Sequence, residues 1–142
     1  MELTVRHFER IPQTNLRIPV REFARLWLTA ERRDAALEAA GEPEDGYLSG
    51  VCATCEWLAG VIIKVRGAGG RPVSVFRPSP VTGMQSKAYE ELIVEEAQAA
   101  EQVVADSPHG EPGFVDGVMA TLAWAWRRSG VPPIDVERAQ VG

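Results

Sequence analysis

Cysteine and histidine are scarce in this chain of 142 residues, and their scarcity excludes several kinds of metal site. The chain has two cysteines, Cys52 and Cys55, and two histidines, His7 and His109. A structural zinc site needs four ligands, usually two closely spaced pairs, and no second cysteine pair exists here. A helical di-iron site needs Glu-x-x-His on two helices, and the sequence contains no such motif. We therefore expect no metal ion.

Motifs for nucleophilic catalysis and phosphate binding are missing as well. There is no Gly-x-Ser-x-Gly elbow and no local Ser/His/Asp constellation. The glycine-rich stretch 67–70 lacks the Gly-Lys-Ser/Thr ending of a P-loop, so it is interpreted as a connector. His109 lies in a turn between two expected helices, and His7 lies in a short alternating segment. The sequence predicts no catalytic residues and no cofactor.

Long apolar runs are absent too. No stretch approaches the roughly 18 apolar residues of a membrane span, and residues 1–10 lack the apolar core of a signal peptide. A cytoplasmic protein with reduced thiols and no membrane partner is therefore expected. Only 2 of the 15 basic residues are lysine, which indicates the arginine bias of a GC-rich bacterial genome. The net charge of -5 argues against a nucleic-acid partner, because phosphate binding needs clustered basic side chains.

The strongest positive feature is an internal repeat. Residues 46–57 (GYLSGVCATCEW) and residues 113–124 (GFVDGVMATLAW) align at a constant separation of 67 residues. The identical pairs are Gly46/Gly113, Gly50/Gly117, Val51/Val118, Ala53/Ala120, Thr54/Thr121 and Trp57/Trp124. Such self-similarity is typical of a duplicated supersecondary unit.

Similarity continues on both sides of the repeated block. A Gly-Glu-Pro turn precedes each copy, at 41–43 and 110–112, and a Pro-x-x-Val segment follows each copy, at 72–75 and 133–136. The units span approximately residues 12–76 and 80–137 of a single domain, 1–142. The predicted fold is mainly α, with two tandem helical-hairpin repeats packed as a four-helix bundle with short extended segments.

The helices can be placed from caps and apolar spacing. The first helix of the first unit is expected from about Pro19 to Ala40, followed by Gly41 as its cap. Its counterpart is expected from about Gly83 to Ala105, with Thr82 and Gln85 as a capping box. Five glutamates on that helix are interpreted as a solvated face: Glu90, Glu91, Glu95, Glu96 and Glu101.

The second helices are expected to begin near Pro43 and Pro112 and to pack in the centre, because they are apolar nearly all round. Glycine inside a helix costs about 1 kcal/mol relative to alanine. Two glycines four residues apart in each copy therefore indicate a close helix–helix crossing near a pseudo-twofold axis. Residues 61–76 are compatible with a β-hairpin, but the repeat favours helix up to residue 63 or 65.

The two cysteines are interpreted through the repeat. Met119 and Leu122 occupy the equivalent positions in the second copy, and both are ordinary core residues. A redox Cys-x-x-Cys normally stands at a helix N-terminus, whereas these cysteines lie well inside an expected helix. Reduced cysteine packs like a small hydrophobic residue, so we expect both side chains to be buried.

Two functions of different classes are favoured over a metal or redox function through Cys52 and Cys55. The first is a non-catalytic bacterial helical interaction or regulatory module that self-associates or docks on a protein partner. Tryptophan and arginine are enriched at interface hot spots, which makes the partner-binding candidates Trp126, Arg127, Arg128 and Trp27, although Trp126 equally suits a core position. The alternative is a small-molecule-binding or enzymatic domain with a pocket between the repeats. Its candidate lining residues are Tyr47, Trp57, Phe114 and Trp124.

Overall fold

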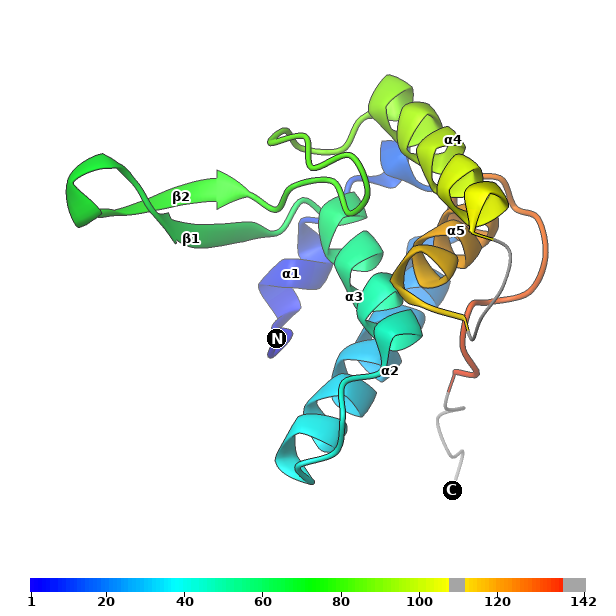
Figure 1. Ribbon diagram of the computed structural model, residues 1–142, viewed down its shortest axis with the longest axis horizontal. Helices are drawn as coiled ribbons and strands as arrows, with labels where there is room; N and C mark the ends of the chain where they lie inside the picture. The colour runs from blue at the N-terminus through cyan, green and yellow to red at the C-terminus, as the bar shows by residue number, and fades with distance from the viewer. Residues whose placement is uncertain (108–111, 137–142) are drawn as a thin grey trace.

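A computed structural model describes residues 1–107 and 112–136 of the chain, shown in Figure 1. Its α-helices are α1 (Val5–Glu9), α2 (Val20–Ala39), α3 (Gly46–Leu58), α4 (Glu90–Asp106) and α5 (Phe114–Ala125). Its strands are β1 (Ile62–Arg66) and β2 (Pro72–Phe76), and short 3-10 helices span Gln13–Asn15 and Ala68–Gly70. The fold is thus mainly helical with one small antiparallel sheet. His109, which is expected in a loop, lies outside the described residues, and so do residues 110 and 111 of the second Gly-Glu-Pro turn.

Helix α2 ends where the sequence predicts. Gly41 has a φ of +66°, its N–H donates to the Glu38 carbonyl, and the Glu42 N–H donates to the Leu37 carbonyl. This pair of bonds satisfies carbonyl groups that the last turn of a helix leaves free, and glycine adopts the required backbone conformation without a Cβ penalty.

The predicted start of α4 at Gly83 is wrong, because the helix begins at Glu90. Gly83 has a φ of +70°, and its N–H donates to the Ser79 carbonyl in a compact loop. The predicted capping box of Thr82 and Gln85 is therefore absent. Thr82 instead belongs to this loop, where its hydroxyl donates to the carboxylate of Glu96 over 2.6 Å.

The extension of α3 to residue 63 or 65, which the repeat favours, is also wrong. Gly60 has a φ of +72°, and the Val61 N–H donates to the Glu56 carbonyl over 3.0 Å, which closes the helix as Gly41 closes α2. The chain then enters β1, which pairs antiparallel with β2 and places Ile62 opposite Phe76. The β-hairpin interpretation of residues 61–76 is the one confirmed.

Helices α3 and α5 cross in close contact at the centre of the molecule, as the glycine spacing predicts. A Cβ added to Gly50 would overlap the carbonyl oxygen of Phe114, and one added to Gly117 would overlap that of Tyr47. The two contacts are reciprocal, since Tyr47 and Phe114 occupy equivalent repeat positions. The Thr54 and Thr121 hydroxyls extend this symmetry, each donating over 2.7 Å to the carbonyl four residues earlier.

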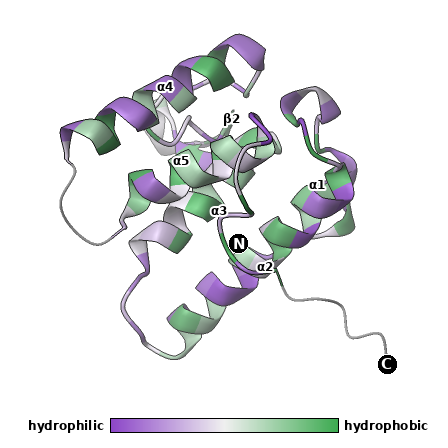
Figure 2. Cartoon of the chain, turned by 90° about the vertical axis from the view of Figure 1, so that its right-hand side faces the viewer, coloured by the Kyte–Doolittle hydropathy of each residue, from purple (hydrophilic) through white to green (hydrophobic). Residues whose placement is uncertain are grey.

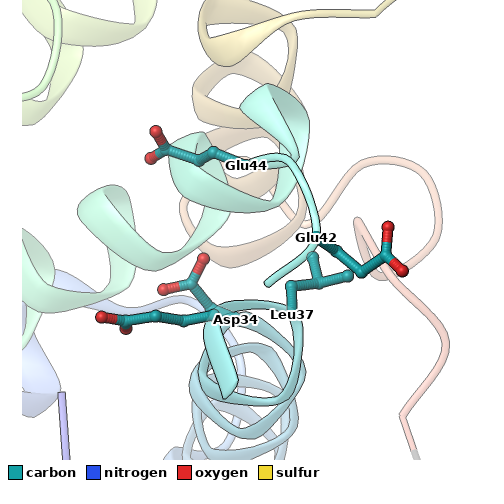
Figure 3. A pocket seen from close by; sticks show the side chains of 5 residues that line it. Asp34, Leu37, Glu42 and Glu44 are labelled. Atoms are coloured by element: carbon teal, nitrogen blue, oxygen red, sulfur yellow. The ribbon is translucent and has the colours of Figure 1, made fainter. Parts of the chain in front are cut away.

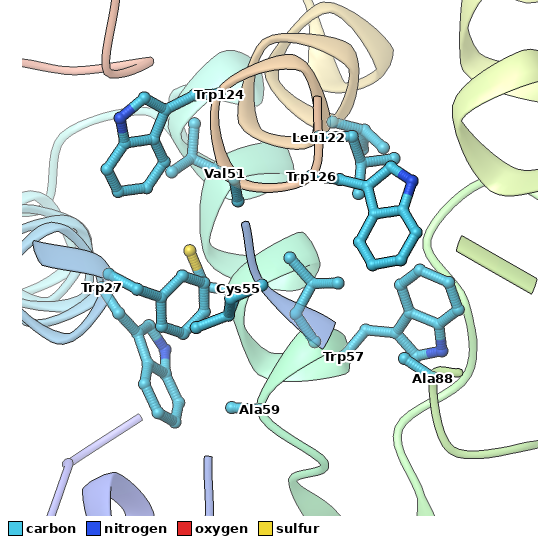
Figure 4. Close-up of a cluster of buried hydrophobic side chains, with 14 of the residues drawn as sticks. Trp27, Val51, Cys55, Trp57, Ala59, Ala88, Leu122, Trp124 and Trp126 are labelled. Carbon is cyan, nitrogen blue, oxygen red and sulfur yellow. The ribbon is translucent and has the colours of Figure 1, made fainter. Parts of the chain in front are cut away.

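The four long helices follow the spatial order α2, α3, α5, α4. Helix α3 packs most extensively against α5, α2 packs against α3, and α4 packs against α5. The outer helices α2 and α4 make no comparably extensive contact with each other in the described part of the chain. Figure 2 shows hydrophilic and hydrophobic residues alternating along both outer helices, and Figure 4 shows the apolar cluster that the central helices contribute to the core.

The segments that precede α2 and α4 reach across to the opposite central helix. The Arg17 N–H donates to the Ala125 carbonyl at the end of α5 over 2.8 Å. The Asn15 amide donates to the Leu58 and Ala88 carbonyls, and the Trp57 indole donates to the Ser86 carbonyl at 3.3 Å. These bonds connect segments of the first half of the chain with segments of the second half. None of the described helices is long and apolar enough to cross a membrane.

Candidate functional site

The β1–β2 hairpin projects away from the helices and is the most prominent surface feature (Figure 1). Among the described elements, its strands make extensive contacts only with each other. An isolated two-stranded hairpin is marginally stable in water, so its base is held by the body of the protein. There the Arg77 N–H donates to the Val61 carbonyl over 2.9 Å.

One face of the hairpin is entirely aliphatic. Because side chains alternate along a strand, Ile63 and Val65 share a face with Val73 and Val75 on the paired strand. Val65 and Val73 are exposed, whereas Ile63 and Val75, the pair nearer the body, are half-buried. Exposed apolar side chains gathered on one element are a common feature of interaction surfaces.

The opposite face of the hairpin combines apolar and basic side chains. Ile62 is 52% exposed and lies opposite Phe76, which is 38% exposed, at the base of this face. Lys64 and Arg66 follow towards the tip on the same face, and Arg71 lies in the turn. All three basic residues are exposed, and none forms an ion pair within residues 1–107 and 112–136. The hairpin therefore combines apolar area with positive charge.

The order of charges along the chain accounts for this concentration. Residues 57–89 contain five basic residues and no acidic one, whereas residues 34–56 contain six acidic residues and no basic one. The net charge of -5 therefore conceals two blocks of opposite sign. This charge order is the sequence signal that would have pointed to the hairpin.

A pair of buried carboxylates lies beneath the base of the hairpin. Glu31 on α2 and Glu56 on α3 are both buried, and Arg77 at the end of the hairpin lies 3.4 Å from a Glu56 oxygen. Burial and the neighbouring Glu31 raise the pKa of Glu56 to about 8, against the opposing effect of Arg77. Glu31 accepts a hydrogen bond from the Trp27 indole at 3.1 Å and lies 3.3 Å from the Met1 amino group. These contacts link the hairpin to α2 and α3.

An acidic groove forms at the other end of the first helical pair, where α2 turns towards α3. It has a volume of about 260 Å³ and is lined by Asp34, Leu37, Glu38, Glu42 and Glu44. Figure 3 shows the Asp34 and Glu44 side chains directed to one side of the groove and Glu42 directed to the other. No ion pair joins any of these carboxylates to a basic residue within residues 1–107 and 112–136.

Two observations show that the electrostatic field in this acidic groove is negative. The C-terminal end of a helix carries a partial negative charge, and the last turn of α2 has no basic residue to offset it. Partial burial, with a further contribution from Glu31, Glu44 and Glu38, raises the pKa of Asp34. Both observations indicate that a positive group placed here would be stabilised.

The predicted partner-binding residues do not form one surface. Trp27 is 0% exposed, with Phe8 edge-on to its ring at 5.9 Å, so its ring is not part of the surface in this structure. Trp126 is 8% exposed, and the Arg17 guanidinium lies 4.1 Å from its ring centroid, which favours the core interpretation. Arg127 and Arg128 are exposed, and Arg127 forms an ion pair with Glu101.

The four aromatic residues predicted to line a ligand pocket are separated. The backbones of α3 and α5 meet at Gly50 and Gly117, leaving no space for a ligand at the crossing. Figure 4 shows Trp57 and Trp124 on different sides of the buried cluster.

Each of these aromatic residues has its own environment. The Tyr47 hydroxyl donates to the Pro133 carbonyl at 2.8 Å, and Phe114 is exposed. Trp124 lines a surface groove of about 330 Å³ with Glu22, Arg25, Pro132 and Val136.

Both cysteines lie in the core, as the repeat predicts. Cys52 and Cys55 are buried and unpaired. Burial is the largest cause that raises the pKa of each thiol, with added repulsion from Glu31 and Glu56. A reactive cysteine needs a lowered pKa, so this environment favours the packing role. No group of three or more His, Cys, Asp and Glu side chains suited to a metal ion occurs among the described residues.

The interpretation of the α4 glutamates as a solvated face is wrong for Glu96. This side chain is 1% exposed, and its carboxylate accepts hydrogen bonds from Val81 N–H, Thr82 N–H and the Thr82 hydroxyl. It therefore fixes the loop that follows the hairpin. The other four glutamates of the predicted face are exposed.

Comparison with known proteins gives no relative: no protein-family model, curated protein or solved structure matches this chain.

Proposed function

We propose that this protein is a non-catalytic interaction module that binds a protein partner through the β1–β2 hairpin. The supporting observation is the hairpin itself, which projects from the helices with an aliphatic face and three exposed basic side chains. Interfaces combine a desolvated apolar centre with a polar rim, and arginine is enriched in them. The sequence-based hypothesis of an interaction module is retained, but the contact residues are now assigned to the hairpin instead of Trp126.

The aliphatic face favours a protein over a nucleic acid as the partner. A ribbon that enters a nucleic-acid groove meets phosphates and polar base edges, which leave Val65 and Val73 without apolar contacts. A protein surface with acidic side chains around an apolar spot satisfies both features of the hairpin. The separated aromatic residues and the closed α3–α5 crossing give no support to a small-molecule pocket between the repeats.

Site-specific photo-crosslinking tests this proposal. A photoreactive amino acid replaces Val73 on the hairpin and, as the matched control, the similarly exposed Val94 on α4. Illumination in the native bacterial lysate should give discrete protein adducts from position 73 and not from position 94. Arg66→Glu with Arg71→Glu should remove those adducts. Adducts that disappear on nuclease treatment, or equal labelling at both positions, would contradict the proposal.

The helical body is further proposed to be a tandem duplication of one helical-hairpin unit that builds a four-helix arrangement. The reciprocal contacts of Gly50 with Phe114 and of Gly117 with Tyr47 support it, as do the equivalent hydroxyl bonds of Thr54 and Thr121. Expression of residues 12–76 alone tests the unit, which should form a symmetric helical dimer through its own Gly50. A monomeric, fully helical fragment would count against the duplication.

A further inference from the structure

We infer that the partner of the hairpin is a second copy of this chain, with the hairpin of one copy docking on the acidic groove of the next. This inference rests on the proposed function and names its partner. Lys64, Arg66 and Arg71 supply the positive charge, and the groove at the α2–α3 turn supplies the negative charge.

The charges determine which surfaces meet. Two hairpins placed face to face would bring three exposed basic side chains against three more, and like charges across an interface are unfavourable. A hairpin on the acidic groove instead brings those cations to carboxylates that have no basic partner in the described part of the chain. Self-association is therefore heterologous, with different surfaces on the two copies.

The groove suits the tip of the hairpin in size and composition. Its volume of about 260 Å³ accommodates one or two side chains, and Leu37 supplies an apolar wall among the carboxylates. The Arg guanidinium is a planar donor that binds carboxylates in pairs of hydrogen bonds, which fits Arg66 and Arg71 on either side of the turn. The end of α2 adds its partial negative charge to this side of the contact.

The two surfaces lie in different parts of one molecule, so they meet only between copies. In Figure 1 the hairpin points away from the body, whereas the end of α2 that forms the groove lies at the lower edge. Heterologous contacts generate closed rings or open filaments according to the rotation between neighbours. The assembly formed by this contact is consequently one of these, and its strength falls as salt screens the charges.

Sedimentation velocity with charge-reversed variants tests the contact. The hairpin variant carries Arg66→Glu and Arg71→Glu, and the groove variant carries Glu38→Arg and Glu42→Arg. The matched control carries Glu91→Arg and Glu95→Arg on the exposed face of α4. Circular dichroism confirms that each variant retains the helical signal and melting temperature of the unmodified protein.

The unmodified protein and the α4 control should associate at low salt, with at least a tenfold weaker association at 0.5 M NaCl. Each of the other two variants alone should sediment as a monomer. An equimolar mixture of the hairpin and groove variants should associate again, because each acidic hairpin then meets a basic groove and each basic hairpin meets an acidic one.

A monomeric unmodified protein at 200 µM and low salt overturns the self-contact, as does a mixture that stays monomeric. If either result is obtained but the photoreactive residue at position 73 still crosslinks to a different protein, the proposed function stands and only the self-contact is wrong. Crosslinking to nucleic acid, or no preference for position 73, overturns the proposed function itself.

Discussion

At Gly50 and Gly117 two helix backbones lie too close together for any side chain. Gly50→Ala would force a Cβ onto the Phe114 carbonyl and within 3.2 Å of the Val118 nitrogen. Both neighbours are backbone atoms, so the helices must separate, and we expect a loss of about 2–3 kcal/mol in the free energy of unfolding. Gly46→Ala is the matched control because its nearest atom would lie 3.5 Å away. Urea denaturation of both variants measures the difference, and equal stabilities would contradict the close crossing.

Glu96 is the second residue on which the fold depends, because its carboxylate accepts hydrogen bonds from the Val81 N–H, the Thr82 N–H and the Thr82 hydroxyl. Glu96→Ala would leave these partly buried donors without their acceptor. Because an unsatisfied buried group costs about 1–3 kcal/mol, we expect a loss of stability towards the lower end of that range. Glu95→Ala, its exposed neighbour, should change stability by less than about 0.5 kcal/mol. Thermal unfolding distinguishes them; the same melting temperature for both variants would show that Glu96 is not an anchor.

Glu56 makes the stability of the protein depend on pH. Its pKa of about 8 in the folded protein lies above that of a glutamate in an unfolded chain, so the folded state binds the proton more tightly. The stabilisation is complete below the unfolded pKa and is lost as pH rises through about 8. We therefore expect the melting temperature to fall between pH 5 and pH 8, and Glu56→Gln to flatten that slope. An unchanged slope in the variant would contradict the assignment.

The hairpin contributes little to the stability of the helices at the scale of secondary-structure elements. Its ends are already adjacent, with Val61 and Arg77 joined by a 2.9 Å hydrogen bond. Replacement of residues 62–76 by a short Gly-Ser turn should keep the far-UV helical signal and shift the melting temperature by only a few degrees. A cooperative loss of helix in this variant would show that the hairpin is part of the core.

The helical elements were predictable where local signals and the repeat agree. Gly41 ends α2, the glycine pairs identify the crossing, and Met119 and Leu122 identify the cysteines as core residues. The helix end at Gly60 carries the same local signal as Gly41. The second unit has Arg127 at the equivalent position, so the repeat favoured a longer helix there.

The remaining features depend on contacts between distant residues. Burial of Glu96 requires the turn at Val81 and Thr82, 14 or 15 residues earlier, to present its N–H groups to α4. Trp27 and Trp126 stand beside arginines in the sequence, but the tertiary packing buries both rings. The direction in which the hairpin projects likewise depends on how the helices pack at its base. No local sequence pattern specifies that packing.

At the scale of the whole molecule, charge separation is the feature that distinguishes this protein from an ordinary helical domain. The acidic block at 34–56 forms the groove at one place, and the basic block at 57–89 forms the hairpin at another. The net charge describes neither surface. In the proposed self-contact, this separation places the two binding surfaces at different sites, so that no change in the helical body is required.

Hydrogen–deuterium exchange tests this account most directly, because it locates the contact without any substitution. The measurement compares dilute protein in high salt with concentrated protein in low salt. The account predicts slower amide exchange in residues 62–76 and 34–45 of the concentrated sample, with unchanged exchange in α4 and α5. Protection confined to α4, or to the turn containing Arg127 and Arg128, would contradict it and place the interaction surface on the opposite side of the fold.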